Sequence, residues 1–107
     1  MKNFIEIKHK IKPFNKKIFV SGDKSLSIRW LLLASQAKGA SRAYGILNSE
    51  DVLSTIACLR KLGVKINITK KYCEVFGVGI NGYKFKNNLI LNAGNSGTLA
   101  RLILGLL

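Results

Sequence analysis

Acidic side chains are scarce in this 107-residue sequence, which has 5 Asp and Glu against 18 Lys and Arg and a formal net charge of +13 at pH 7. A positive charge of this size attracts phosphate-bearing partners. The lysines are dispersed, however, and the sequence has no nucleic-acid recognition motif and no ladder of aromatic residues for stacking bases. We therefore expect an anionic small molecule as the partner and no nucleic acid, with a small basic nucleic-acid-binding module as the alternative function.

Cysteine, histidine and proline are also nearly absent. Cys58 and Cys73 do not form a C-x-x-C pair, and we expect two buried or idle thiols. His9 is the only histidine, so no metal site is expected and no cofactor is implied. A single proline and an apolar fraction of 48% are typical of a globular chain.

Long hydrophobic runs are missing as well. The longest, 30–34 and 102–107, are far shorter than the roughly 20 residues that cross a bilayer. The N-terminus alternates charged and apolar residues and has no apolar core of a signal peptide. The sequence therefore predicts a cytoplasmic protein that does not enter a membrane.

What the chain does have is a glycine turn that leads into an apolar helix at residues 20–29. Free backbone N–H groups and the positive end of the helix dipole favour an anion at such a helix start. Lys24, Ser25 and Arg29 add an ammonium, a hydroxyl and a guanidinium there, a set that suits a phosphate or a carboxylate. Each also has a plainer interpretation, because Lys24 could be solvated, Ser25 could only cap the helix, and Arg29 could pair with a structural carboxylate.

A similar turn and helix recur near the C-terminus. Gly94 and Arg101 follow Gly22 and Arg29 at the same offset of 72 positions, and apolar residues follow both arginines. A fixed offset predicts one supersecondary unit used twice.

The remaining pattern predicts an α/β fold. We expect helices over 25–38, with Gly39 after its end, over 50–62, with an N-cap at 48–49 and Gly63 after its end, and after 97. Strands are expected over 4–12, 17–21, 43–47, 64–69, 72–76 and 89–91, with the fourth and fifth forming a hairpin. This alternation of strands and helices implies some parallel pairing.

The sequence resembles a known enzyme family at three motifs in the family's order. These are G-D-K-S-L-S-I-R at 22–29, the residues 47–55 with 59–64, and G-N-S-G-T-L-A-R at 94–101. All three resemble the N-terminal part of the 3-phosphoshikimate 1-carboxyvinyltransferase (EPSP synthase) family. The sister family that acts on UDP-N-acetylglucosamine fits the pattern of Lys24 to Arg29 less well.

The resemblance implies an EPSP synthase-like fold of repeated βαβαββ units, with one complete unit here and the start of a second. By this resemblance, residues 1–20 hold strands that partly join the other domain, 21–88 form the first unit, and 89–107 begin a second, truncated unit. The chain then corresponds to about the first quarter of the family's enzyme, and the full-length enzyme is expected to be a monomer.

The resemblance also implies the function, which is transfer of the enolpyruvyl group of phosphoenolpyruvate to the 5-hydroxyl of shikimate 3-phosphate. It implies that Lys24 contacts both substrates, that Ser25 and Arg29 bind shikimate 3-phosphate, and that Gly97 approaches phosphoenolpyruvate. The supporting loop comprises Asn95, Ser96, Thr98 and Arg101. No catalytic residue falls in this segment, so we expect the isolated chain to be inactive; a non-functional truncated remnant is a further alternative.

Overall fold

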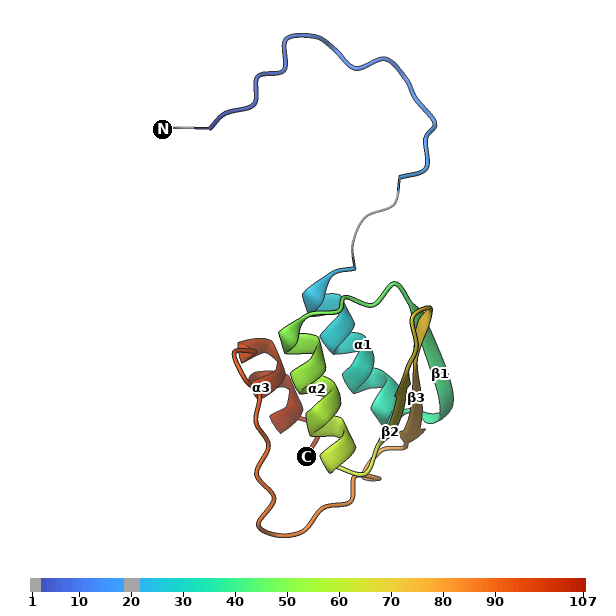
Figure 1. Ribbon diagram of the computed structural model, residues 1–107, viewed down its shortest axis with the longest axis vertical. Coiled ribbons are helices and arrows are strands. Elements are labelled where there is room, and N and C mark those ends of the chain that lie inside the picture. The colour runs from blue at the N-terminus through green and yellow to red at the C-terminus, as the bar shows by residue number, and fades with distance from the viewer. Residues whose placement is uncertain (1–2, 19–21) are drawn as a thin grey trace.

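The computed structural model describes residues 3–18 and 22–107. These residues form three helices, α1 (Lys24–Gln36), α2 (Glu50–Lys61) and α3 (Gly97–Leu104), and three strands, β1 (Lys38–Tyr44), β2 (Lys65–Ile68) and β3 (Tyr72–Val78). The sheet lies on one side, α1 and α2 pack against it, and α3 lies on the side of these helices away from the sheet (Figure 1). The predicted mixed α/β fold is confirmed.

The sheet has the strand order β1-β3-β2, and both pairings are antiparallel. Tyr44 lies opposite Tyr72, and Lys65 lies opposite Phe76. The expectation of parallel pairing is therefore wrong for neighbouring strands in the described part of the chain. β1 and β2 do run in the same direction, but the hairpin places β3 between them.

The hydrophobic core lies between the sheet and the helices. Its fully buried members come from every layer, with Ile28 and Leu31 on α1, Leu59 on α2, Val75 on β3 and Leu99 on α3. Burial of one such side chain contributes about 1.5–3 kcal/mol relative to an exposed position. The core therefore fixes all three helices relative to the sheet.

Helix α2 matches its prediction at both ends. The Ser49 side chain caps it by accepting from the backbone N–H of Val52, and Glu50 and Asp51 occupy the first turn, where the helix dipole favours acidic groups. Gly63 follows the end with φ +89°. Both signals are local in the sequence, which explains why this helix was predictable.

Helix α1 ends earlier than predicted, at Gln36 rather than Lys38. A Cβ on Gly77 of β3 would lie only 2.1 Å from the carbonyl oxygen of Ala37, so the backbone of β3 lies directly against the end of the helix. The Gly79 N–H also donates to that carbonyl at 3.0 Å. The chain then enters β1 at Lys38, so the strand predicted at 43–47 begins and ends earlier.

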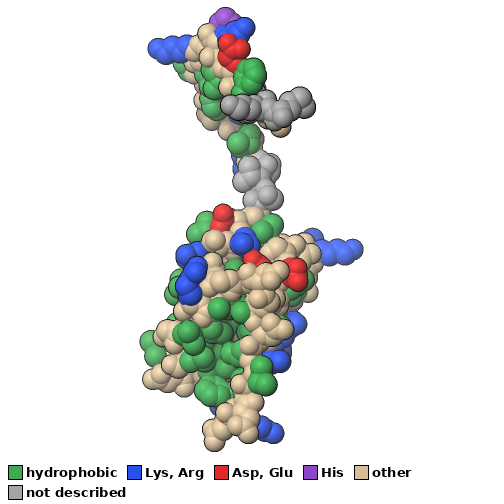
Figure 2. Space-filling model, turned by 90° about the vertical axis from the view of Figure 1, so that its left-hand side faces the viewer, with side chains coloured by type: hydrophobic (Ala, Val, Ile, Leu, Met, Phe, Trp, Pro, Cys, Tyr) green, Lys and Arg blue, Asp and Glu red, His purple; other side chains and the backbone are tan. Residues whose placement is uncertain are grey.

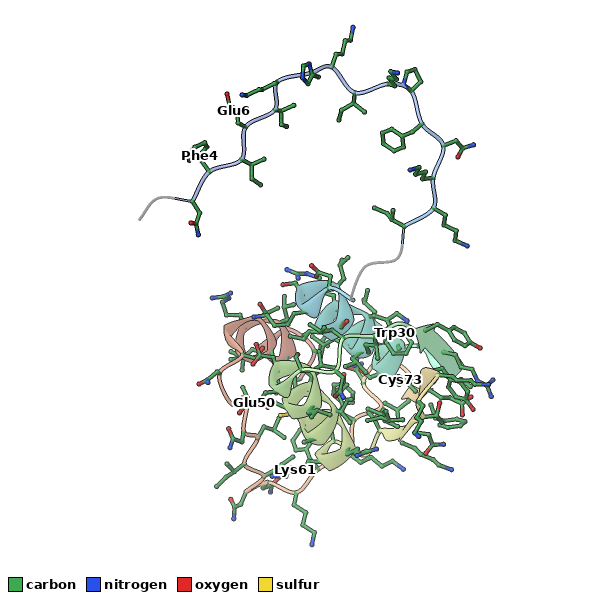
Figure 3. The ribbon with its side chains drawn as sticks, turned by 45° about the horizontal axis from the view of Figure 1, so that its top comes forward. Phe4, Glu6, Trp30, Glu50, Lys61 and Cys73 are labelled. Carbon is green, nitrogen blue, oxygen red and sulfur yellow. The ribbon has the colours of Figure 1, made fainter. Side chains whose placement is uncertain are left out.

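The three other predicted strands, 4–12, 17–21 and 89–91, are not strands over those of their residues that the structure describes. Residues 4–12 and 17–18 are extended and exposed, as Figure 3 shows for Phe4 and Glu6, and no strand of the described chain lies beside them. Positions 19–21 lie outside the described residues. Residues 89–91 run beside α2 as irregular chain. A strand requires pairing with a neighbouring strand, and the sheet of the described residues contains only β1, β3 and β2.

Candidate anion-binding site

Helix α1 begins with an aspartate cap. The Asp23 carboxylate accepts from the backbone N–H of Leu26 at 2.7 Å, and its carbonyl accepts the first helical hydrogen bond from Ser27. The cap interpretation of Ser25 is therefore wrong, since Ser25 is already the second residue of the helix. In the described structure its hydroxyl makes no hydrogen bond, which leaves it available to a ligand.

The start of α1 is fixed against the segment that precedes α2. A Cβ on Gly22 would lie 2.2 Å from the carbonyl oxygen of Gly45 and 2.8 Å from the backbone nitrogen of Leu47, so only glycine fits there. The Ser27 hydroxyl donates to the Asp23 carbonyl at 2.6 Å and accepts from the Leu47 N–H at 3.1 Å. Ser27 is not among the predicted site residues, although its spacing of four from Asp23 is a detectable signal.

Lys24 lies beside the first turn of α2. Its ammonium nitrogen is 3.1 Å from a carboxylate oxygen of Asp51, whose side chain is only 15% exposed. A cation at a helix start is opposed by the dipole of its own helix, and the neighbouring carboxylate offsets that repulsion. Asp51 thus supplies an internal anion to Lys24, a role that the sequence analysis did not assign.

Arg29 has no acidic partner among the described residues. Its Nη1 donates to the carbonyl oxygen of Ser25 at 3.2 Å, one helical turn earlier. The side chain borders a groove of about 260 Å³ between α1 and α3, whose other walls are leucines. Hydrophobic side chains gather on the face of the molecule that carries α3 (Figure 2). The guanidinium therefore combines a backbone anchor with free donors that can bind an anion.

Helix α3 begins with a serine cap and a tight turn. The Ser96 hydroxyl is buried and accepts from the Leu99 N–H at 3.0 Å. The Gly94 N–H donates to the Asn92 side chain at 2.8 Å, and Gly94 has φ +58°. A Cβ on Gly94 would lie 2.9 Å from the hydroxyl of Ser54, so this turn lies directly on α2.

A cysteine also holds this loop. The Cys58 thiol of α2 donates to the carbonyl oxygen of Asn92 at 3.3 Å. Burial raises the pKa of Cys58, and the nearby Lys61 only partly opposes this shift. Cys58 is therefore a protonated structural donor at neutral pH and not a nucleophile.

The Arg101 guanidinium reaches back from the last turn of α3 to Gly97 at its start. A Cβ on Gly97 would lie 3.6 Å from Nη1 of Arg101, an ordinary contact distance. A Cβ at Gly97 would therefore not collide with the chain, and its nearest neighbours would be the guanidinium atoms of Arg101. Asn95 is exposed and Thr98 half-buried on either side of the turn.

The predicted repeat is only approximate. The two caps, Asp23 and Ser96, are 73 positions apart, whereas Arg29 and Arg101 are 72 apart. The offset therefore changes by one between the cap and the arginine. Arg29 is the sixth residue of the 13-residue helix α1, whereas Arg101 lies in the last turn of the shorter helix α3.

All three helices begin at the same end of the molecule (Figure 1). Figure 3 shows the direction for α2, since Glu50 lies toward the start of α1 and Lys61 at the opposite end. The ion pair of Lys24 with Asp51 and the contact of Gly94 with Ser54 place the other two helix starts beside α2. Among the described residues, no hydrogen bond or ion pair joins the group 24–29 to the group 95–101, and Arg101 is the single basic residue of the second group.

This arrangement defines an α/β unit that presents three positive helix ends and basic side chains at one end, a class suited to anionic ligands. The described residues contain no cluster of three His, Cys, Asp or Glu that could hold a metal ion, and no helix among them is long and apolar enough to cross a membrane. The family model described as EPSP synthase (3-phosphoshikimate 1-carboxyvinyltransferase) matches residues 8–107, and the chain belongs to this family.

Individual relatives agree with this assignment. The chain is 44% identical over 101 residues to a 3-phosphoshikimate 1-carboxyvinyltransferase of Alkaliphilus metalliredigens and 44% identical over 103 residues to one of Streptococcus suis. These matches cover 94% and 96% of the chain but 24% of each relative, so the chain spans about a quarter of their length.

A solved structure shares the fold. The EPSP synthase from Acinetobacter baumannii superposes with a TM-score of 0.76 at 38% identity, over 86% of this chain and 21% of that enzyme. The division of the chain at residues 20 and 88 and the roles of the individual site residues stay predictions.

Proposed function

We propose that this chain is the N-terminal, substrate-binding part of an enzyme that transfers the enolpyruvyl group of phosphoenolpyruvate to the 5-hydroxyl of shikimate 3-phosphate. In the overall reaction, the hydroxyl oxygen bonds to C2 of phosphoenolpyruvate, the bond from C2 to the phosphate oxygen breaks, and the hydroxyl proton leaves with the phosphate. Both substrates are polyanions, so their binding needs fixed cations and N–H donors.

The observation that carries this proposal is the start of α1. Arg29 has no acidic partner in the described structure, and the Ser25 hydroxyl makes no hydrogen bond there. Both follow an aspartate-capped helix start whose position is fixed by the close approach of Gly22 to Gly45. We assign Ser25 and Arg29 to shikimate 3-phosphate and Lys24 to both substrates.

The start of α3 supplies the second part of the proposed site. We assign Gly97 to the approach of phosphoenolpyruvate, where a side chain would collide with the ligand. Asn95, Ser96 and Thr98 shape the loop, supported by the buried Ser96 cap. Arg101, whose guanidinium lies over Gly97, anchors the turn.

Binding of shikimate 3-phosphate to the 107-residue chain tests the assignment, with isothermal titration calorimetry as the measurement. Arg29→Gln is expected to weaken binding about tenfold or more, because a charge-assisted hydrogen bond contributes about 1.5–3 kcal/mol. Asp51→Asn is expected to strengthen binding, because it removes the carboxylate that competes for Lys24. Lys86→Gln, an exposed lysine in the loop before α3, is the matched control for loss of one charge.

Two results would overturn the proposal. One is equal weakening by Arg29→Gln and Lys86→Gln, which would reduce the effect to net charge. The other is turnover of both substrates by the isolated chain, which would contradict the expectation that the catalytic groups lie outside it. We also propose that the full-length enzyme acts as a monomer in the cytoplasm without binding nucleic acid; steep salt dependence of binding to arbitrary DNA would contradict the last point.

A further inference from the structure

A second hollow is lined in part by residues 45–48, the segment that fixes the start of α1. Its volume is about 220 Å³, and it opens between the turn of the β2–β3 hairpin and the segment 45–48. Val52 and Ile56 of α2 form part of its floor, and both are almost fully buried. The proposed substrate-binding residues 24, 25 and 29 do not line this hollow.

The hollow has an apolar interior and a basic rim. Leu53 and Ile68 line it although they are 49% and 47% exposed, so apolar surface there remains in contact with water. Lys70 and Lys71 stand at the hairpin turn, and neither has an acidic partner among the described residues. Covering this apolar surface would be favourable, and two cations stand beside it to attract an anion.

The rim is held in place by the hairpin turn itself. The Thr69 hydroxyl accepts from the N–H groups of Lys71 and Tyr72 at 3.2 and 3.1 Å. The Thr69 N–H in turn donates to the carbonyl of Tyr72 at 2.9 Å. The backbone that carries the two lysines is thus ordered without a ligand, which lowers the entropic cost of binding.

We propose that this hollow binds a small apolar carboxylate, with a single ring or a short branched chain inside and the carboxylate at Lys70 and Lys71. The size follows from the volume, because a buried apolar cavity of about 150 Å³ accommodates benzene. The charge follows from the two unpaired cations at the rim. Such a ligand would contact the segment 45–48, and neither Gly22 nor Ser27 lines the hollow.

Benzoate is the probe, titrated into the 15N-labelled 107-residue chain at constant ionic strength. Saturable shifts of the amide signals of residues 46–47 and 69–72 are expected. Benzyl alcohol, which has the ring without the charge, should bind at least about fivefold more weakly, in line with the modest strength of exposed ion pairs. Inorganic phosphate, which has the charge without the ring, should give no saturable shifts at these positions.

Two variants test the two halves of the proposed site. The double substitution Lys70→Gln and Lys71→Gln should weaken benzoate binding about fivefold or more, and Leu53→Trp should abolish it by filling the hollow. The matched control is Lys84→Gln with Lys86→Gln, which removes two charges from an exposed loop and should leave binding within about twofold. The lysine variants change only exposed side chains, so they remain informative if Leu53→Trp does not fold.

Three results would overturn the proposed benzoate site. Equal weakening in both lysine pairs would overturn the proposal, because it would reduce binding to net charge. Equal affinity for benzoate and phosphate at residues 69–72 would overturn it too, as would an absence of saturable shifts. Since the proposal does not involve Arg29, loss of shikimate 3-phosphate binding in Arg29→Gln would leave benzoate binding unchanged.

Discussion

At the scale of single residues, Ser25 and Ser27 of α1 are only two positions apart but have different environments. The Ser27 hydroxyl is buried and bridges the Asp23 carbonyl and the Leu47 N–H, whereas the Ser25 hydroxyl has no partner in the described structure. Ser25 is a predicted ligand-binding residue, whereas Ser27 has no predicted role. Their burial separates a ligand-binding candidate from a residue that holds the site in position.

Substitution of Ser27 by alanine should lower the free energy of unfolding by about 1–3 kcal/mol, because it leaves the Leu47 N–H without its partner. Ser25→Ala should change that free energy by less than about 0.5 kcal/mol, because the half-buried Ser25 hydroxyl makes no hydrogen bond in the described structure. Urea unfolding followed by circular dichroism measures both. Equal losses in the two variants would contradict the assignment of the structural role to Ser27.

At the scale of elements, the end of α1 is determined by another part of the chain. A Cβ on Gly77 would lie 2.1 Å from the carbonyl oxygen of Ala37 and 2.5 Å from that of Ala34, so β3 must approach the helix with a glycine. The local sequence predicts that α1 ends just before Gly39, but Gly39 lies inside β1.

Gly77→Ala should lower the free energy of unfolding by about 3 kcal/mol, because the strand and the helix must separate to admit the methyl group. Gly105→Ala is the matched control, since the nearest atom to a Cβ there is the Leu102 carbonyl oxygen at 3.5 Å. The control should be neutral or slightly stabilising. Thermal unfolding compares the two, and a Gly77→Ala variant as stable as the control would disprove the close packing.

Elements with local signals could be predicted, and those that depend on distant partners could not. Helix α2 was predictable because Ser49 and Gly63 mark its ends within the sequence. The segment 89–91 has the composition of a strand but lies beside α2 without a strand partner in the described chain. The same distinction applies to the candidate site. Ser25 and Arg29 could be chosen as candidates because their spacing is local in the sequence. The contact of Lys24 with Asp51 joins two helices, so no local pattern predicts it.

At the scale of the whole molecule, the net charge of +13 acts against compactness. Among the described residues, the ion pairs of Lys24 with Asp51 and of Arg42 with Glu74 connect different elements, and the sequence offers only 5 Asp and Glu to 18 Lys and Arg. Most of the lysines therefore repel one another through solvent. The same excess of Lys and Arg over Asp and Glu thus attracts anionic ligands and makes the basic side chains repel one another.

The thermal unfolding midpoint should accordingly rise with sodium chloride between about 10 mM and 500 mM, because the screening length falls from about 30 Å to below 10 Å over that range. Differential scanning calorimetry at neutral pH measures the effect. A control series in sucrose at constant low salt separates screening from solute exclusion. A midpoint that fell with salt would show that the few attractive pairs outweigh the repulsion.

The ion pair of Lys24 with Asp51 has a consequence for which anions can compete at the start of α1. An ammonium that already faces a carboxylate at 3.1 Å gains less from one extra negative charge than a bare ammonium does. A chloride ion would have to displace Asp51 or share Lys24 with it, and it brings no second contact to offset that competition. In the site proposed above, a phosphate ester would gain contacts with Arg29 and Ser25 in addition to Lys24, so we expect it to compete with Asp51 more effectively than chloride does.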